Sequence, residues 1–316
     1  LAQGGGNAGG RYLLYYGLLH FFQNGGGPCY IVSVGDYATD VDGSALQAGI
    51  ERLVAEREPT LLGIPDAVLL GRPDCIAVQK AMLSHCGGRM RNRVAILDVW
   101  EGWRSQKDSN CIASFRNALG TDHLDFGAAY YPWVNTNLVQ AKDLGLENIA
   151  PESRDLLIDL LRCDLGLPSP LPATADPKAQ RLSELLDDIR SVTDAPGAEG
   201  LSPKAGELEA HKARLNASLQ AASPLFMTIF AEMAIRLNLL PPSAAVAGIY
   251  AMVDSTRGVW KAPANVSLNG VISPAVNLSH EEQEELNVSV QGKAINAIRS
   301  FVGQGVLVWG ARTLAG

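Results

Sequence analysis

The sequence predicts an α/β fold in which a mostly parallel β-sheet is flanked by helices. Over residues 30–131, short and nearly continuous apolar segments alternate with segments whose apolar residues recur at helical spacing. Apolar strands that alternate with helices are typical of parallel sheets buried on both faces. Hydrophobic residues make up 47% of the 316 residues and charged residues 19%, which is the balance of a globular chain.

Strands are predicted where short, β-branched or apolar segments are bounded by Gly, Pro or Asp. These segments are residues 30–34, 60–64, 93–98 and 126–131. Helices are predicted where apolar residues recur three or four positions apart. These segments are residues 12–22, 45–57, 75–86 and 113–119. In the first helix, we expect the apolar face to contain Leu14, Leu18 and Phe21 or Phe22.

The composition changes after Trp133, where charged helical patterns replace the alternation. Helices are predicted at residues 152–165 and 182–192, with Pro- and Gly-rich linkers at 166–172 and 194–197. We expect residues 138–225 to form an inserted helical subdomain at the surface, since long insertions are best tolerated there. Residues 1–137 would form the first part of a core, and residues 226–316 would complete it as an α+β portion.

The C-terminal part opens with an apolar helix, predicted at residues 226–239 and stopped by two prolines. A loop-rich run at 254–265 and a strand-like piece at 266–272 follow. Ser279 and Glu282 have the spacing of a capping box, which predicts a helix start. The acidic cluster at 281–285 is explained as the solvated start of that helix, with docking to a partner as the alternative.

Charge and composition exclude several classes of protein. The net charge of −7 argues against a nucleic-acid binder, because phosphate binding needs a concentrated basic surface. No apolar run reaches the roughly 18 residues of a membrane span. The five cysteines are odd in number and widely spaced, which argues against a disulfide framework or a zinc site. The five histidines form no metal-binding motif, so no cofactor or metal is expected.

Two aspartates at strand ends, Asp66 and Asp98, are the best candidates for catalysis. Ligands of open α/β sheets bind beyond the carboxyl ends of the strands. The structural alternative, which we favour, is that each aspartate caps the turn or helix that follows it. Gly4, Gly6 and Gly9 match the dinucleotide fingerprint, but no strand precedes them to aim the loop at a pyrophosphate. A nucleotide-dependent α/β enzyme therefore stays a second hypothesis without a specific motif.

Several colinear motifs resemble the contractile tail sheath proteins of phages, R-type pyocins and phage-like contractile injection systems. The first three are Phe-Phe-Gln-Asn-Gly-Gly-Gly-Pro-Cys-Tyr-Ile at 21–31, Pro-Thr-Leu-Leu-Gly-Ile-Pro-Asp at 59–66 and Arg-Val-Ala-Ile-Leu-Asp at 93–98. The others are Ala-Tyr-Tyr-Pro-Trp at 129–133, Pro-Pro-Ser-Ala-Ala-Val-Ala-Gly-Ile-Tyr at 241–250, Arg-Gly-Val-Trp-Lys-Ala-Pro-Ala-Asn at 257–265, an Asn-Ala-Ile-Arg turn at 296–299 and a Trp-Gly-Ala-Arg-Thr-Leu strand at 309–314. Ala244 stands where the family has Gly, and residues 138–225 are where the chain departs from the family.

The resemblance implies a structural protein and not an enzyme. Sheath subunits form a helical assembly of stacked hexameric rings around an inner tube, and the assembly contracts to drive the tube through a target cell envelope. The implied partners are other sheath subunits, the inner tube protein, and baseplate and tail terminator proteins, with no nucleic acid and no membrane insertion. The implied location is the bacterial cytoplasm during assembly, and afterwards a virion tail, a bacteriocin or an extracellular particle.

The resemblance also implies interface residues, which are Arg257, Trp260, Lys261, Arg299, Val308, Trp309 and Arg312. Arginine and lysine would form structural or intersubunit ion pairs, with anion binding as the alternative, and tryptophan would anchor the core or an interface. Family members link subunits through terminal arms that add a strand to a neighbour's sheet. We expect residues 1–316 to be a folded core without those arms, and residues 306–309 to receive or flank an arm. Val308→Pro would then abolish tubes and leave the core folded.

Three hypotheses follow from the sequence. The first is the contractile sheath subunit. The second is the nucleotide-dependent enzyme, which predicts thermal stabilisation by ATP or NAD. The third is a non-contractile scaffold on the same core, which predicts rings without a second, shorter state. The sequence does not distinguish among phage, bacteriocin and toxin-delivery systems.

Overall fold

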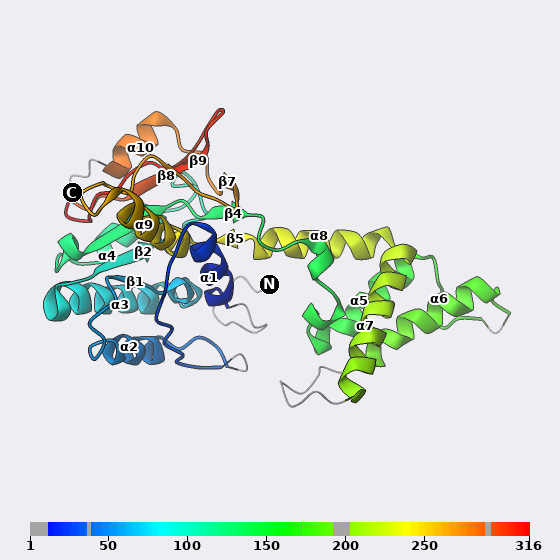
Figure 1. Cartoon of the computed structure of the whole chain (residues 1–316). Helices are drawn as coiled ribbons and strands as arrows, with labels where there is room; N and C mark the ends of the chain where they lie inside the picture. Colours follow the sequence, from blue (N-terminus) through cyan, green and yellow to red (C-terminus); the bar gives the residue numbers. More distant parts are fainter. Residues whose placement is uncertain (1–11, 37–38, 173, 192–202, 288–291) are drawn as a thin grey trace. The chain divides into compact units, whose positions relative to one another are not determined.

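A computed structural model describes residues 12–36, 39–172, 174–191, 203–287 and 292–316. The chain divides into two compact units (Figure 1). The sheet unit comprises Leu1–Leu138 and Asn238–Gly316, and the helical unit comprises Val139–Leu237. The glycine motif at residues 4–9 lies outside the described residues. The α/β class and the mostly parallel sheet with flanking helices are confirmed.

The sheet unit contains a six-stranded sheet in the order β1-β2-β3-β8-β9-β6. These strands are β1 (Leu61–Gly63), β2 (Val94–Asp98), β3 (Gly127–Tyr131), β8 (Asn296–Phe301), β9 (Gly305–Val308) and β6 (Val266–Ser267). The first four are parallel, and β9 pairs antiparallel with both β8 and β6. A smaller antiparallel sheet contains β5 (Leu239–Leu240), β4 (Val134–Thr136) and β7 (Val271–Pro274).

Alternate strand residues build a core on each face of the large sheet, as expected for buried parallel strands. On one face, Leu97, Tyr131 and Ala297 join the core that includes residues of the flanking helices. These helices are α2 (Gly43–Arg52), α3 (Arg72–Leu83), α4 (Cys111–Ala118) and α10 (His280–Asn287). On the other face, Ile96 and Tyr130 pack with residues of α9 (Ser243–Arg257). The helices α3 and α9 therefore lie on opposite faces of the strands (Figure 1).

Helix α1 (Leu14–Gln23) packs against α9 along a line centred beside the predicted face, of which Leu14, Leu18 and Phe21 are half-buried. The buried residues of α1 are Gly17 and His20, whereas Phe22 is 52% exposed. The close approach of the two backbones explains the difference. A Cβ atom at Gly248 of α9 would lie 2.3 Å from the carbonyl oxygen of Phe21. Apolar periodicity alone does not reveal a face that is buried through glycine.

Four expectations about local structure are wrong. Residues 30–34 form no strand, and most of this segment is exposed. The strand-like piece at 266–272 is divided between β6 and β7, because Gly270, at a φ of +73°, turns the chain. The expected turn at 296–299 begins strand β8, and the expected strand at 309–314 follows β9 as a loop.

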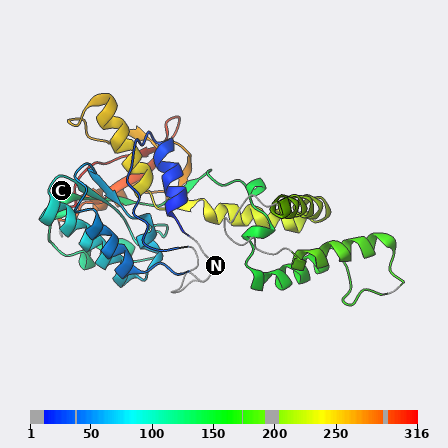
Figure 2. The same ribbon diagram turned by 60° about the horizontal axis from the view of Figure 1, so that its bottom comes forward.

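The helical unit contains the helices α5 (Arg154–Asp164), α6 (Pro177–Asp187), α7 (Pro203–Ala222) and α8 (Pro224–Leu237) (Figure 2). Their buried residues include Leu161, Leu186, Leu219 and Phe230. The predicted boundary between the inserted subdomain and the C-terminal part of the core, at 225/226, falls at the start of α8. Helix α8 packs with α5 and α7 and belongs to the helical unit. Among the described residues no single helix could cross a membrane; α7 and α8 pass that test only as a pair bent by 112°.

Short helical turns connect these elements. They are η1 (Pro65–Leu69), the π-helix η2 (Ser84–Met90), η3 (Leu124–Phe126), η4 (Ala141–Asp143), η5 (Leu146–Asn148), η6 (Pro151–Ser153) and η7 (Asp188–Ser191). The capping box predicted for α10 is present: the Ser279 hydroxyl accepts from the Glu282 N–H at 3.2 Å, and the Glu282 carboxylate accepts from the Ser279 N–H at 2.8 Å.

Candidate interaction surfaces

The loop Arg257–Lys261 presents an aromatic residue between two cations. Helix α9 ends at Arg257, and Gly258 follows with a φ of +89°. The Trp260 ring folds back over this glycine, where a Cβ atom would lie 2.3 Å from the ring. The Lys261 N–H donates to the Gly258 carbonyl at 3.1 Å and closes the turn. Only glycine satisfies both the backbone angle and the space, so the sequence Arg-Gly-Val-Trp-Lys specifies this loop.

Most of this loop is open to solvent. Trp260 is 85% exposed and Val259 is 80% exposed. Arg257 is exposed, Lys261 is half-buried, and neither has an ion-pair partner among the described residues. Tryptophan and arginine are the residue types enriched at the anchor points of protein interfaces, and Trp260 and Arg257 supply both in this loop. The predicted role of Arg257, Trp260 and Lys261 in an interface stays a prediction, and this geometry is compatible with it.

The Asn-Ala-Ile-Arg motif has a structural explanation centred on Asn296. This residue is fully buried at the start of β8. Its side-chain amide donates to the Arg312 carbonyl at 2.8 Å and to the Ala129 carbonyl at 3.2 Å. Its side-chain oxygen accepts from the Arg312 N–H at 2.8 Å. Asn296 therefore holds the loop after β9 against β3, a role that our sequence analysis did not assign.

Val308 and Trp309 lie on and after β9, which is not an edge strand. Val308 is fully buried and pairs with Ile298 of β8 and with Val266 of β6. Trp309 is 39% exposed, and the centre of its ring lies 4.6 Å from the centre of the Phe301 ring. Residues 306–309 were expected to receive or flank an arm. Receiving an arm is wrong for β9 itself, because both of its sides are already paired, whereas flanking an arm stays a prediction. The outer strand beside it is β6.

Arg299 and Arg312 bind groups within the sheet unit. The Arg299 guanidinium donates to the Gln283 side chain and lies 5.4 Å from the centre of the Phe301 ring. These contacts join α10 to β8. The Arg312 guanidinium donates to the Asn287 carbonyl at 3.3 Å. Neither arginine has a carboxylate partner among the described residues, so both serve here as donors to neutral acceptors.

Asp66 and Asp98 both cap helices, but not the helices that follow them in the chain. The Asp66 carboxylate accepts from the Leu13 N–H at 2.5 Å, beside the start of α1. The Asp98 carboxylate accepts from the Ser243 N–H at 2.8 Å, at the start of α9. Burial raises the pKa of both carboxyls, for Asp98 to about 7. The caps join sequence segments 53 and 145 residues apart, which sequence spacing does not show.

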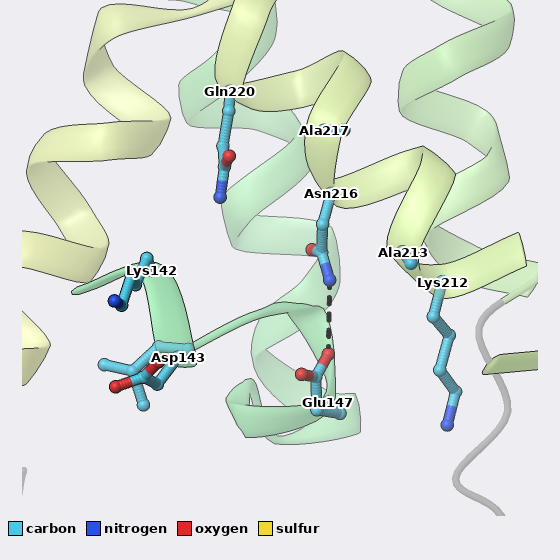
Figure 3. Close-up of a pocket in the computed structure, with 9 residues that line it drawn as sticks. Lys142, Asp143, Glu147, Lys212, Ala213, Asn216, Ala217 and Gln220 are labelled. Atoms are coloured by element: carbon cyan, nitrogen blue, oxygen red, sulfur yellow. Dashed lines mark hydrogen bonds between the residues drawn. The ribbon is translucent and has the colours of Figure 1, made fainter. Parts of the chain in front are cut away.

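The helical unit has an open cavity of about 300 Å³ (Figure 3). Its lining is mostly polar and includes Lys142, Glu147, Asn216 and Gln220. The Asn216 amide donates to Glu147 at 3.3 Å, and its oxygen accepts from the Leu146 N–H at 3.0 Å, so Asn216 holds η5 on α7. No group of three or more His, Cys, Asp or Glu side chains suited to a metal occurs in the described part of the chain.

Comparisons with known proteins agree with the resemblance. Residues 171–314 match the family model of the phage tail sheath protein central domain. This match begins inside the expected insertion at 138–225 and so includes its second part. No curated protein matches the chain.

Solved structures add a likeness of fold. The chain is similar to one in the cryo-EM structure of the anti-feeding prophage (AFP) baseplate in contracted state, with 22% identity, a TM-score of 0.50, and coverage of 96% of this chain and 56% of that chain. It is also similar to one in the contracted PVC sheath complex, an extracellular contractile injection system, with 23% identity, a TM-score of 0.47, and coverage of 97% and 52%. The chain thus spans about half the length of these proteins.

Proposed function

We propose that this chain, which matches the phage tail sheath central-domain model over residues 171–314, is a structural subunit of a contractile sheath. In this proposal, copies polymerise as stacked hexameric rings around an inner tube and contract to drive the tube through a target envelope. Baseplate and tail terminator proteins close the two ends. Assembly takes place in the cytoplasm of the producing bacterium, and the product is a phage tail or an extracellular particle.

The observation that carries the proposal is the family match over residues 171–314. It covers the loop Arg257–Lys261 and the strands β8 and β9, where the sequence motifs are most specific. Residues 12–134 add further colinear motifs. The adjacent and exposed side chains of Val259 and Trp260 support a role in association, because tryptophan is enriched at protein interfaces.

The mechanism that we propose resides in the interfaces between copies. A sheet with a core on both faces moves as a rigid body. Contraction then exchanges one set of contacts between copies for another of lower free energy. A difference of a few kcal/mol per subunit, the usual gap between two states of a switch, adds up over the whole lattice.

We infer that the protein acts without catalysis and without a cofactor. The two strand-end carboxyls that favour an enzyme, Asp66 and Asp98, are engaged as helix caps. This engagement supports the structural role. An enzyme would be revealed by saturable thermal stabilisation with ATP or NAD.

Negative-stain electron microscopy tests the proposal. The full-length protein should be expressed with and without its inner tube protein. We expect striated hollow tubes, whose pitch depends on the tube protein. Dispersed particles under every condition would contradict the proposal, and rings without a second, shorter state would favour a non-contractile scaffold.

A further inference from the structure

The loop Arg257–Lys261 combines a defined conformation with a large exposed aromatic side chain. Its conformation is specified by Gly258 and by the turn between Gly258 and Lys261. Trp260 packs one side of its ring over Gly258 and leaves most of its surface open. Because the loop already has this conformation, binding loses little conformational entropy in ordering it. Arg257 and Lys261, on either side of Trp260, favour a partner with negative charge.

Helix α10 has an acidic face that fits this loop. Gln283 and Leu286 are buried against the sheet unit, whereas Glu281, Glu284 and Glu285 are exposed. The Glu284 carboxylate Oε1 lies 3.2 Å from Nε2 of His280. In the described part of the chain, the carboxylates of Glu281 and Glu285 have no ion-pair partner. They are four residues apart and so are neighbours on one side of the helix, with Cβ atoms about 6 Å apart.

Other carboxylates near this face are already engaged. Glu282 accepts from the Ser279 N–H and lies 3.4 Å from Lys107. Glu281 and Glu285 form no ion pair in the described residues and can face an outside cation; Arg116, which donates to the Glu285 carbonyl, also attracts the Glu285 carboxylate from within the same copy. The sheet unit thus carries two unpaired cations on one element and two unpaired carboxylates on another.

We propose that the loop Arg257–Lys261 of one copy docks on the acidic face of α10 of a second copy. Arg257 and Lys261 face Glu281 and Glu285, and Trp260 fills the centre of the contact. The inference deepens the proposed sheath function and rests on it, since it names the surfaces that join neighbouring subunits. The charge complementarity of the two surfaces selects a second copy as the partner.

The two surfaces differ, so the contact is heterologous: each copy offers its loop to one neighbour and its helix to another. Heterologous contacts generate closed rings or open helical assemblies, depending on the rotation between copies. A symmetric dimer would instead use the same surface twice. The proposed contact therefore has the connectivity that a ring or helical lattice needs.

Charge reversal tests the contact in the full-length protein assembled with its inner tube protein. We expect Arg257→Glu/Lys261→Glu to reduce sedimentable tubes by at least about tenfold, because like charges facing each other across an interface repel strongly. We expect the same from Glu281→Lys/Glu285→Lys. All four changes together restore opposite charges, and tubes should return. Lys261→Arg is the matched control and should assemble normally.

A second measurement identifies the neighbours directly. Lys261→Cys/Glu285→Cys is made in a background where the exposed Cys29 and Cys163 are replaced by Ser. A short bifunctional thiol reagent should join copies into ladders in assembled tubes and not in the unassembled protein. Circular dichroism checks that each variant is folded.

The outcomes separate the two proposals. If the wild-type protein forms no tubes under any condition, the sheath proposal fails. If wild-type tubes form and both charge-reversed variants form them equally well, only the contact is overturned. The contact is also overturned if each reversal abolishes tubes but the fourfold reversal does not restore them, because the loop must then bind a different surface.

Discussion

Asp98 shows how one buried residue connects two distant parts of the chain. It ends β2 and caps α9, and burial raises its pKa to about 7 from an ordinary value of 3.8. Between these two pH values the folded state keeps a proton that the unfolded state has released. The free energy of unfolding therefore falls as the pH rises from about 4 to about 7, and above that Asp98 adds no further dependence.

Replacing this carboxyl makes the pH dependence measurable. Asp98→Asn keeps an oxygen acceptor for the Ser243 N–H and removes the titration. We expect the wild-type protein to lose on the order of 4 kcal/mol relative to this variant between pH 4 and pH 7. All five tryptophans lie in the sheet unit, so urea unfolding followed by their fluorescence reports on the right part of the molecule. Parallel pH profiles for the two proteins would refute this assignment.

Asn296 is the second residue whose side chain holds separate segments together. We expect Asn296→Ala to lower the free energy of unfolding by about 2–4 kcal/mol, because it removes three hydrogen bonds and leaves buried backbone groups unpaired. The exposed Gln304, on the hairpin between β8 and β9, is the control, and its change to Ala should have an effect within about 0.5 kcal/mol. Equal changes in the free energy of unfolding for the two variants would show that the hydrogen bonds of Asn296 do not hold these segments together.

At the scale of elements, the packing of α1 on α9 depends on Gly248. Alanine is normally the better helix former by about 1 kcal/mol. Here its Cβ atom would lie 2.3 Å from the Phe21 carbonyl oxygen, which belongs to the backbone. We expect Gly248→Ala to destabilise the sheet unit by about 1–3 kcal/mol. Gly27, which has no neighbour within 4 Å, is the control, and a stabilised Gly248→Ala protein would contradict this packing.

The position of β9 changes what a proline should do there. Val308 is fully buried between β8 and β6, and proline is excluded from central strands because it cannot donate to a neighbour. We expect Val308→Pro to abolish cooperative unfolding of the sheet unit, contrary to the expectation from sequence alone. Val308→Ala should retain a cooperative transition at lower urea concentration. A folded Val308→Pro protein would show that β9 is less central than its pairing indicates.

Strand prediction succeeded where burial and local propensity agree. Residues 60–64, 93–98 and 126–131 contain β1, β2 and β3 because their apolar side chains are buried on both faces of the sheet. Residues 30–34 are also mostly apolar and β-branched, but they form no strand. Strand pairing is a tertiary property, and propensity does not supply a partner.

The candidate surfaces could be predicted only in part. The motif Arg257–Lys261 was identified from its residues. The packing of the Trp260 ring over Gly258 was not predicted. Asn296 lies in a quoted motif, yet its clamp on Arg312 depends on a loop that follows another strand. A capping role was predicted for Asp66 and Asp98, but the helices that they cap were not. Each of these gaps concerns a contact between segments far apart in the chain.

At the scale of the whole molecule, our account places function in the lattice. The chain spans 56% of the solved protein in the contracted AFP baseplate, and tubes are to be made from the full-length protein. Cryo-EM of its tubes, before and after contraction is triggered, tests the central claim most directly. We predict two helical lattices, the second shorter and wider, in which the sheet unit superposes and only the contacts between copies change. A single lattice in both conditions, or a sheet unit that refolds between them, would contradict the account.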